Sequence, residues 1–126
     1  MLKAVLIVAV GGGLGAVMRY SLSLWLNPEK LTVMWGTLTA NILGSFLMGL
    51  CLGWSETHPV PNWIKLLIMV GFCGALTTFS SFAAETLILA IRERLGTAFL
   101  AVVLHTVGSL GAIAAGYALY RYWLAA

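Results

Sequence analysis

Three uncharged segments decide most of what this chain can fold into. The stretches Thr32 to Trp54, Leu66 to Ala84 and Thr97 to Tyr120 contain no Asp, Glu, Lys or Arg. Each meets the roughly 20 residues that a helix needs to cross the hydrocarbon core of a bilayer. A fourth apolar stretch, Ala4 to Leu26, is interrupted only by Arg19. The sequence therefore predicts four membrane-spanning helices.

The expected fold class is an all-α integral membrane protein. Of the 126 residues, 61% are hydrophobic and 9% are charged, so the chain lacks the polar surface of a water-soluble domain. Helices are predicted at about residues 4–26, 32–54, 63–91 and 97–124. The links between them are short, which predicts a single four-helix domain over residues 1–126. No cleavage pattern follows the first apolar stretch, so we expect this helix to be permanent.

Several classes of function are not supported by the composition. The net charge of +3 comes from so few ionisable groups that nucleic acid is not an expected partner. Cys51 and Cys73 lie in apolar spans without a CxxC or histidine neighbour, and we interpret them as small buried apolar residues. The glycine-rich run of residues 11–15 lacks the Lys-Ser/Thr ending of a phosphate loop. We find no catalytic constellation and do not expect an enzyme.

Positive charges are balanced between the two sides of the predicted bundle. The N-terminus, the second loop and the C-terminus share one side, which carries Lys3, Lys65 and Arg121. The first and third loops share the other side, which carries Lys30, Arg92 and Arg94, plus Arg19 if it reaches that far. The positive-inside rule then has little to act on. We expect insertion in both orientations, which in a homo-oligomer would favour antiparallel partners.

Small residues recur at the four-residue spacing that lets membrane helices approach closely. The pairs and triplets are Gly11 with Gly15, Gly12 with Ala16, Gly49 with Gly53, and Gly108 with Ala112 and Gly116. Packing within one chain and packing against another subunit both explain such spacing. The number of small faces favours an oligomer.

Polar residues on the second predicted helix form one stripe, because Thr37, Asn41 and Ser45 are four residues apart. Such groups commonly link membrane helices, and this is the favoured interpretation for Ser45. Asn41 lies near the middle of the span, where unpaired amide N–H groups are costly. It must therefore face protein or a polar pathway.

The third predicted helix contains a candidate break near its centre. Gly71-Phe72-Cys73-Gly74 is followed closely by four hydroxyl residues in the run Thr77 to Ser81. An unwound segment is tolerated at membrane depth only where protein or a polar cavity satisfies its backbone, and unwound carbonyls coordinate cations in transporters. The alternative is a regular helix whose hydroxyls bond to its own carbonyls.

Two further pairs of residues are candidates for a site. Phe79 and Phe82 share a helix face, where ordinary packing competes with ring edges that point at an anion. His105 and Ser109 are four residues apart on the fourth helix, and the histidine would be a proton relay or a satisfied core residue.

Arg19 and Glu85 are the only charges well inside the predicted spans. Intramembrane ionisable groups are functional candidates by default. Both residues lie near helix ends, so each has an interfacial alternative, and Arg19 either snorkels to the interface or lines a vestibule.

Taken together, these motifs resemble those of the Fluc (CrcB) fluoride channels. The matching residues are Gly12-Gly13-Leu14-Gly15-Ala16 with Arg19-Tyr20, Gly36-Thr37-Leu38 with Asn41 and Gly44-Ser45-Phe46, Gly71-Phe72-Cys73-Gly74 with Thr77-Thr78-Phe79-Ser80-Ser81-Phe82 and Glu85, and His105 with Gly108-Ser109. They run in order through all four predicted helices. The combination of the third-helix run with the block around Asn41 is the most specific part of the match.

The resemblance implies an antiparallel homodimer with two pores, each built from both subunits, in a bacterial inner membrane. The expected fluoride pathway comprises Asn41 as a donor, Phe79 and Phe82 through their ring edges, Ser109, Thr37, Ser80 and His105, with Arg19 near a vestibule. Carbonyl groups of Gly74 and Thr77 from both chains would hold a structural sodium ion at the dimer axis. The sequence departs from the usual pattern at Ala75, Ser81 and Ala83.

Two other functions remain open from the residues alone. A proton-coupled exporter of the small multidrug type also has four helices, but it requires a deep carboxylate, and the first three spans offer only Glu85. A non-transporting assembly subunit would use the same small-residue faces. Fluoride efflux from liposomes distinguishes the channel from both.

Overall fold

The computed structural model is an all-helical bundle, and it describes residues 1–27, 35–92 and 94–124. Its elements are α1 (Leu2–Leu26), α2 (Trp35–Thr57), α3 (Asn62–Ile64), the π-helical segment η1 (Lys65–Cys73), α4 (Gly74–Leu76), α5 (Phe79–Ile91), α6 (Leu95–Leu119) and the π-helical segment η2 (Tyr120–Leu124). Among the described residues, four stretches are long and apolar enough to span a membrane: α1, α2, Asn62–Ile91 and Leu95–Leu124. The prediction of four spanning helices is confirmed.

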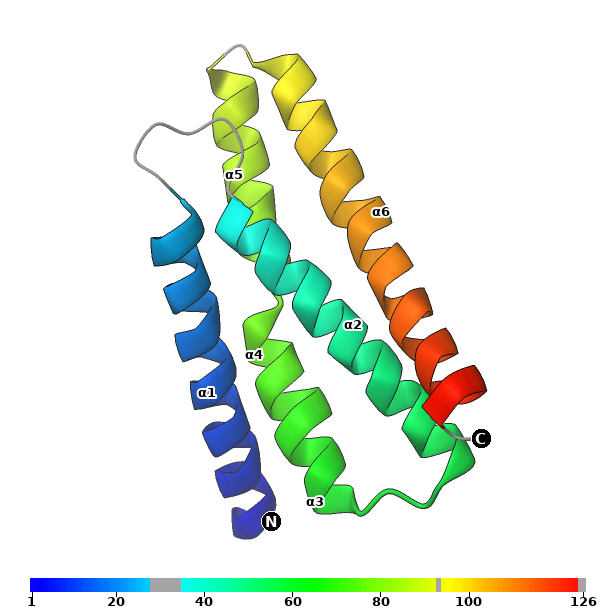
Figure 1. The fold of residues 1–126 in the computed structure, drawn as a ribbon. Coiled ribbons are helices and arrows are strands. Elements are labelled where there is room, and N and C mark those ends of the chain that lie inside the picture. Colours follow the sequence, from blue (N-terminus) through cyan, green and yellow to red (C-terminus); the bar gives the residue numbers. More distant parts are fainter. Residues whose placement is uncertain (28–34, 93, 125–126) are drawn as a thin grey trace.

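The described ends of these stretches lie within a few residues of the sequence-based boundaries. The predicted start of the second helix at residue 32 and the charged residues Lys30 and Glu93 lie outside the described residues. The start of α1, the end of η2 and the link after α2 lie at one end of the bundle, and the end of α5 and the start of α6 lie at the opposite end (Figure 1).

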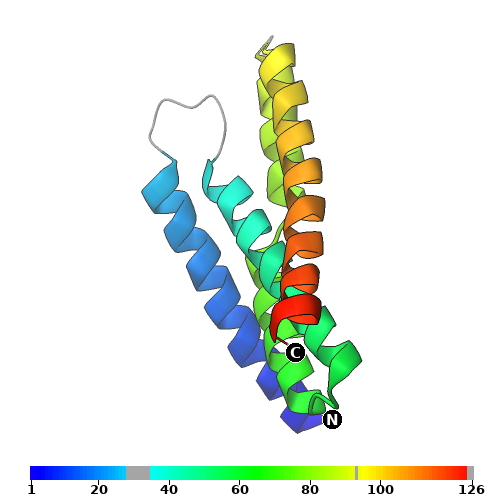
Figure 2. The ribbon, with the colours of Figure 1, turned by 45° about the vertical axis from the view of Figure 1, so that its right-hand side comes forward.

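Two packed pairs of segments make up most of the bundle. α1 lies along η1 and α4, whereas α2 packs along α6. A view turned by 45° again shows α1 beside the first half of the third span and α6 beside α5 (Figure 2). α2 runs obliquely across the bundle and also contacts α1 and α4, so the centre of the third span lies against α2 near the middle of the bundle (Figure 1).

Glycines allow backbones to touch in both pairs. A Cβ atom on Gly11 or Gly15 would overlap a carbonyl oxygen of η1, and one on Gly49 would overlap the Ile113 carbonyl oxygen. Likewise, a Cβ atom on Gly116 would overlap the carbonyl oxygen of Phe46. These four small residues therefore serve close packing within the chain.

We expect Gly116→Ala to destabilise the protein by about 1–3 kcal/mol, because the added methyl must displace the α2 backbone. Gly111→Ala is the matched control on the same helix, since nothing lies within 4 Å of a Cβ atom built there. Thermal unfolding in detergent measures both. A Gly116→Ala variant as stable as wild type would show that the α2 and α6 backbones are not in contact.

Candidate functional site

The helical path of the third span is interrupted at two residues midway along it. α4 ends at Leu76, after which Thr77 (φ −78°, ψ 148°) and Thr78 (φ −150°, ψ 120°) are extended. α5 then begins at Phe79, and the Thr78 hydroxyl accepts a hydrogen bond from the Ser81 backbone N–H at 3.2 Å. Threonine is a preferred residue at this position because its oxygen satisfies an N–H that lacks a helical partner.

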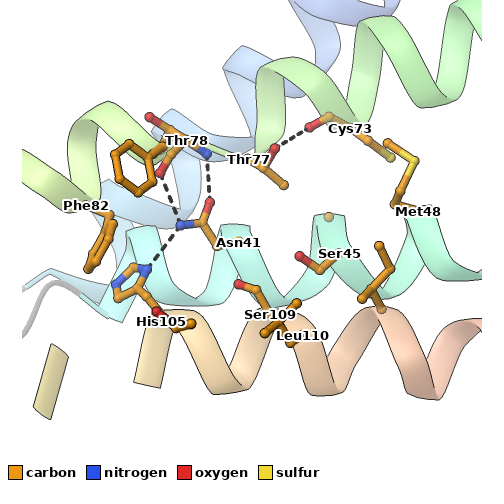
Figure 3. Close-up of a pocket in the computed structure, with 14 residues that line it drawn as sticks. Asn41, Ser45, Met48, Cys73, Thr77, Thr78, Phe82, His105, Ser109 and Leu110 are labelled. Carbon is orange, nitrogen blue, oxygen red and sulfur yellow. Dashed lines mark hydrogen bonds between the residues drawn. The ribbon is translucent and has the colours of Figure 1, made fainter. Parts of the chain in front are cut away.

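Asn41 of α2 is hydrogen-bonded to the interruption. Its Oδ1 accepts from the Thr78 backbone N–H at 2.7 Å, and its Nδ2 donates to the Thr78 carbonyl at 3.2 Å. Nδ2 also lies 3.1 Å from Nδ1 of His105 on α6 (Figure 3). Only 8% of Asn41 is exposed, and its amide pairs with both backbone polar groups of the extended residue Thr78.

The interruption also leaves two carbonyl groups without their usual helical donors. The Thr78 N–H, which would pair with the Gly74 carbonyl in a continuous α-helix, is bonded to Asn41. The Ser81 N–H, which would pair with the Thr77 carbonyl, is bonded to the Thr78 hydroxyl. Gly74 is exposed on the single chain. Both oxygens are therefore available to other partners.

Three aromatic rings form a connected group beside Asn41. The rings of Phe79 and Phe82 are 5.5 Å apart at 71°, an edge-to-face contact. Phe82 stacks on His105 with ring centroids 4.5 Å apart. His105 is 5% exposed, whereas Phe79 is 79% exposed on the single chain. The imidazole is thus held between Phe82 and Asn41, and Phe79 extends from the group to the surface.

These side chains line a cavity of about 450 Å³ between α2, the interrupted third span and α6. Its lining is Asn41, Gly44, Ser45, Met48, Cys73, Thr77, Thr78, Phe79, Phe82, His105, Thr106, Ser109, Leu110 and Ile113. Amide, hydroxyl and imidazole groups supply its polar atoms, and no Asp, Glu, Lys or Arg is among these residues. The lining therefore carries amide, hydroxyl and imidazole groups but no carboxylate, ammonium or guanidinium group.

A second, more polar cavity lies on the other side of the interruption. It is lined by Ala16, Arg19, Tyr20, Ser23, Asn27, Thr37, Ser81 and Glu85. The Thr37 hydroxyl donates to Glu85 Oε1 at 2.5 Å. Arg19 Nη1 lies 3.5 Å from Ser81 Oγ, which is a long contact. Both charges that the sequence places inside spans are therefore found here.

The structure brings together most, but not all, of the expected pathway residues. Asn41, Phe79, Phe82, His105 and Ser109 line the first cavity, as does Ser45. Thr37 follows the same helical spacing yet lines the second cavity. Ser80 is exposed and lines neither, and its hydroxyl lies 3.2 Å from that of Thr78.

Thr78 was not singled out from the sequence as a site residue. Its backbone nevertheless makes both hydrogen bonds to Asn41, and its hydroxyl caps α5. The signal available in the sequence was its place just before Phe79, where a helix restarting after a break needs a capping hydroxyl. Cys51 and Cys73 are buried free thiols.

Comparison with known proteins gives a consistent family. The protein-family model described as CrcB-like protein, Camphor Resistance (CrcB), matches residues 6–117. Proteins named fluoride-specific ion channel FluC from Salmonella arizonae and Salmonella newport are each 44% identical to this chain over 122 residues. These alignments cover 95% of the chain and 95% of each relative.

Proposed function

This chain belongs to the CrcB-like protein family, and from that membership we propose that it is a passive, selective fluoride channel and not an enzyme. Its four apolar spans make it a multi-pass membrane protein. The proposed site of conduction is the cavity that contains Asn41 and His105, with the bacterial inner membrane as the expected location.

The structural observation that supports this proposal, beside family membership, is the chemistry of that cavity. Fluoride is small, strongly hydrated and a strong hydrogen-bond acceptor, so a selective path must replace its water with closely spaced donors. A fixed positive charge would bind the ion too tightly for rapid release. The cavity supplies Asn41, Ser45, Thr78, His105 and Ser109 without any Asp, Glu, Lys or Arg in its lining.

The proposed pathway includes every residue expected from the sequence, in two parts. Asn41, Phe79, Phe82, His105 and Ser109 form its central part, to which Ser80 is adjacent through Thr78. Thr37 and Arg19 belong to the second cavity, which is the proposed vestibule. Ser81 contacts both Arg19 and Thr78, so it lies where the two parts approach each other.

We further propose that the channel is an antiparallel homodimer with two pores. A backbone interruption cannot face lipid, because its polar groups would be unsatisfied there. Gly74 and Phe79 are exposed on the single chain next to this interruption. A partner subunit covering this face would shield the interruption and complete the pore wall around Phe79.

We also propose that backbone carbonyl oxygens beside the interruption bind a structural sodium ion at the dimer axis. The Gly74 and Thr77 carbonyl oxygens have lost their helical donors to Asn41 and to the Thr78 hydroxyl. Unwound carbonyls are ligands that sodium takes in membrane proteins. Among the residues described, no group of three His, Cys, Asp or Glu side chains is placed to hold a metal, so backbone oxygens from two chains are the proposed ligands.

The direction of transport follows from acid–base chemistry. Hydrogen fluoride enters cells as a neutral molecule and dissociates in a less acidic cytoplasm. A passive fluoride path then lets the trapped ion leave. The rival proton-coupled exporter needs a deep carboxylate, and Glu85 instead accepts a hydrogen bond from Thr37 in the second cavity.

Fluoride efflux from liposomes that contain only this protein tests the proposal. Efflux should begin when a potassium ionophore supplies the counter-ion pathway, and it should require no proton gradient. Chloride-loaded liposomes are the selectivity control. Absence of fluoride efflux from correctly folded protein, or efflux only with a proton gradient, would contradict a passive channel.

Phe79 and Phe82 are predicted to act through their ring edges. Replacing either with Ile keeps most of the apolar volume and removes the ring quadrupole, so fluoride efflux should fall by about tenfold or more while unfolding temperature changes little. Phe99→Ile is the matched control, because Phe99 is a 70% exposed ring on α6 outside both cavities. Wild-type efflux from both variants would assign the two rings to packing alone.

A further inference from the structure

The orientation of the Asn41 side-chain amide is fixed by the backbone N–H and carbonyl of a single residue, Thr78. The Thr78 N–H only donates, so the atom 2.7 Å from it must be the amide oxygen of Asn41. The Thr78 carbonyl only accepts, so the atom 3.2 Å from it must be the amide nitrogen. A flipped amide would place donor against donor and acceptor against acceptor. The amide therefore has one allowed orientation.

This orientation determines which imidazole nitrogen carries the proton. One N–H of Asn41 Nδ2 goes to Thr78, and the other faces His105 Nδ1 at 3.1 Å. That ring nitrogen must accept, so a neutral His105 carries its proton on Nε2. Stacking against Phe82 fixes the plane of the same ring. Two independent contacts thus hold the imidazole.

We propose that His105 is a positioning residue for conduction: as the neutral Nε2–H tautomer, it accepts the second amide N–H of Asn41 and so holds that amide on the extended Thr78 peptide. The inference rests on the proposed fluoride function. Both N–H groups of Asn41 are occupied by acceptors of the protein. A passing anion must replace one of these acceptors, which a strong acceptor such as fluoride does more readily than chloride.

Protonation of His105 would turn Nδ1 from a hydrogen-bond acceptor into a donor. An imidazolium carries N–H groups on both nitrogens, so Nδ1–H would face the Asn41 N–H and the link would break. Burial of the ring opposes this change, because His105 is only 5% exposed and a charged group loses its hydration there. Among the described residues that line the cavity none is charged: α2 contributes Asn41, α5 contributes Phe82, and η1 contributes the neutral Cys73. Glu85 of α5 is bonded to Thr37 in the other cavity. His105 should therefore stay neutral near neutral pH, and conduction should fall only at a pH acidic enough to protonate the buried ring.

Two substitutions separate positioning from simple packing. His105→Asn places an amide oxygen near the site of Nδ1, where it accepts from Asn41 but does not titrate. His105→Leu fills much of the space and leaves the Asn41 N–H unpaired. We expect fluoride efflux to be about tenfold lower for His105→Leu than for His105→Asn, because in His105→Leu a buried donor has lost its acceptor.

The pH profile is a second readout. Efflux, corrected for leakage of hydrogen fluoride through protein-free liposomes, is measured between about pH 8 and pH 5.5. Wild-type efflux and His105→Asn efflux should run in parallel near neutral pH, and any difference between them should be a decrease of wild-type efflux at the acidic end. A rise of wild-type efflux relative to His105→Asn on acidification, or full activity of His105→Leu, would overturn the proposal.

Nitrogen NMR tests the tautomer independently of transport. The chain has two histidines, so ¹⁵N-histidine labelling in a His58→Gln background leaves one signal set, from His105. The proposal requires a protonated Nε2 and an unprotonated Nδ1 at neutral pH. The reverse assignment would overturn it even if the protein conducts fluoride, and the expected one would stand even if the fluoride function failed.

Discussion

Asn41→Asp should abolish fluoride efflux while the protein still folds and assembles. The substitution is nearly isosteric, but the carboxylate has no N–H for the Thr78 carbonyl or for His105 Nδ1, both of which Asn41 contacts. It also places a negative charge in an anion path. Two like charges about 4 Å apart repel by about 4 kcal/mol at an effective dielectric constant near 20, which corresponds to about a thousandfold lower flux.

Asn62→Asp provides the matched control for this experiment. It makes the same chemical change at an exposed residue at the start of α3, away from both cavities. Its efflux should equal that of wild type. Size-exclusion chromatography and thermal unfolding would show whether Asn41→Asp is assembled, and unchanged efflux from an assembled variant would remove Asn41 from the conduction path.

The four-helix architecture could be predicted because membrane insertion depends on local composition. A segment such as Thr97 to Tyr120, with no charge over more than 20 residues, has few alternatives to a spanning helix. A candidate break in the third span could also be located from the sequence, because glycines and hydroxyl residues cluster around Thr77. Both inferences depend only on residues that are close together in the sequence.

Contacts between distant residues could not be predicted in the same way. The spacing of Thr37, Asn41 and Ser45 places them on one helix face, yet the third span crosses that face and separates Thr37 from the other two. Likewise, the bond between Asn41 and His105 joins residues 64 positions apart. Helical periodicity fixes which way a side chain points, but not which helix lies opposite.

The spacing of the glycines likewise does not predict which helix packs against them. Small-residue spacing predicts close approach, and Gly49 and Gly116 do allow close approach. The spacing alone did not distinguish a neighbour within the chain from one in another subunit. For these residues the neighbour is in the same chain, so the expectation of an oligomer now rests on the interrupted span and on the charge balance.

A small charge bias should remove fluoride protection by forcing every chain into one orientation. Lys3, Lys65 and Arg121 are balanced by Lys30, Arg92 and Arg94, and the start of α1 and the end of η2 lie at the same end of the bundle (Figure 1). Several lysines appended after residue 126 should keep that end in the cytoplasm, because positive residues near span ends resist translocation. An appended serine tail of equal length is the control and should leave protection intact.

Co-expression decides whether lost protection comes from lost antiparallel pairing. Cells that make only the lysine-tailed variant should become fluoride-sensitive, since all copies would point one way. A second variant, biased oppositely by lysines in the first and third loops, should restore resistance when both are made together. Labelling of single introduced cysteines from either side would verify the two orientations. Full protection by the lysine-tailed variant alone, with labelling showing one orientation, would replace the antiparallel dimer by a parallel assembly.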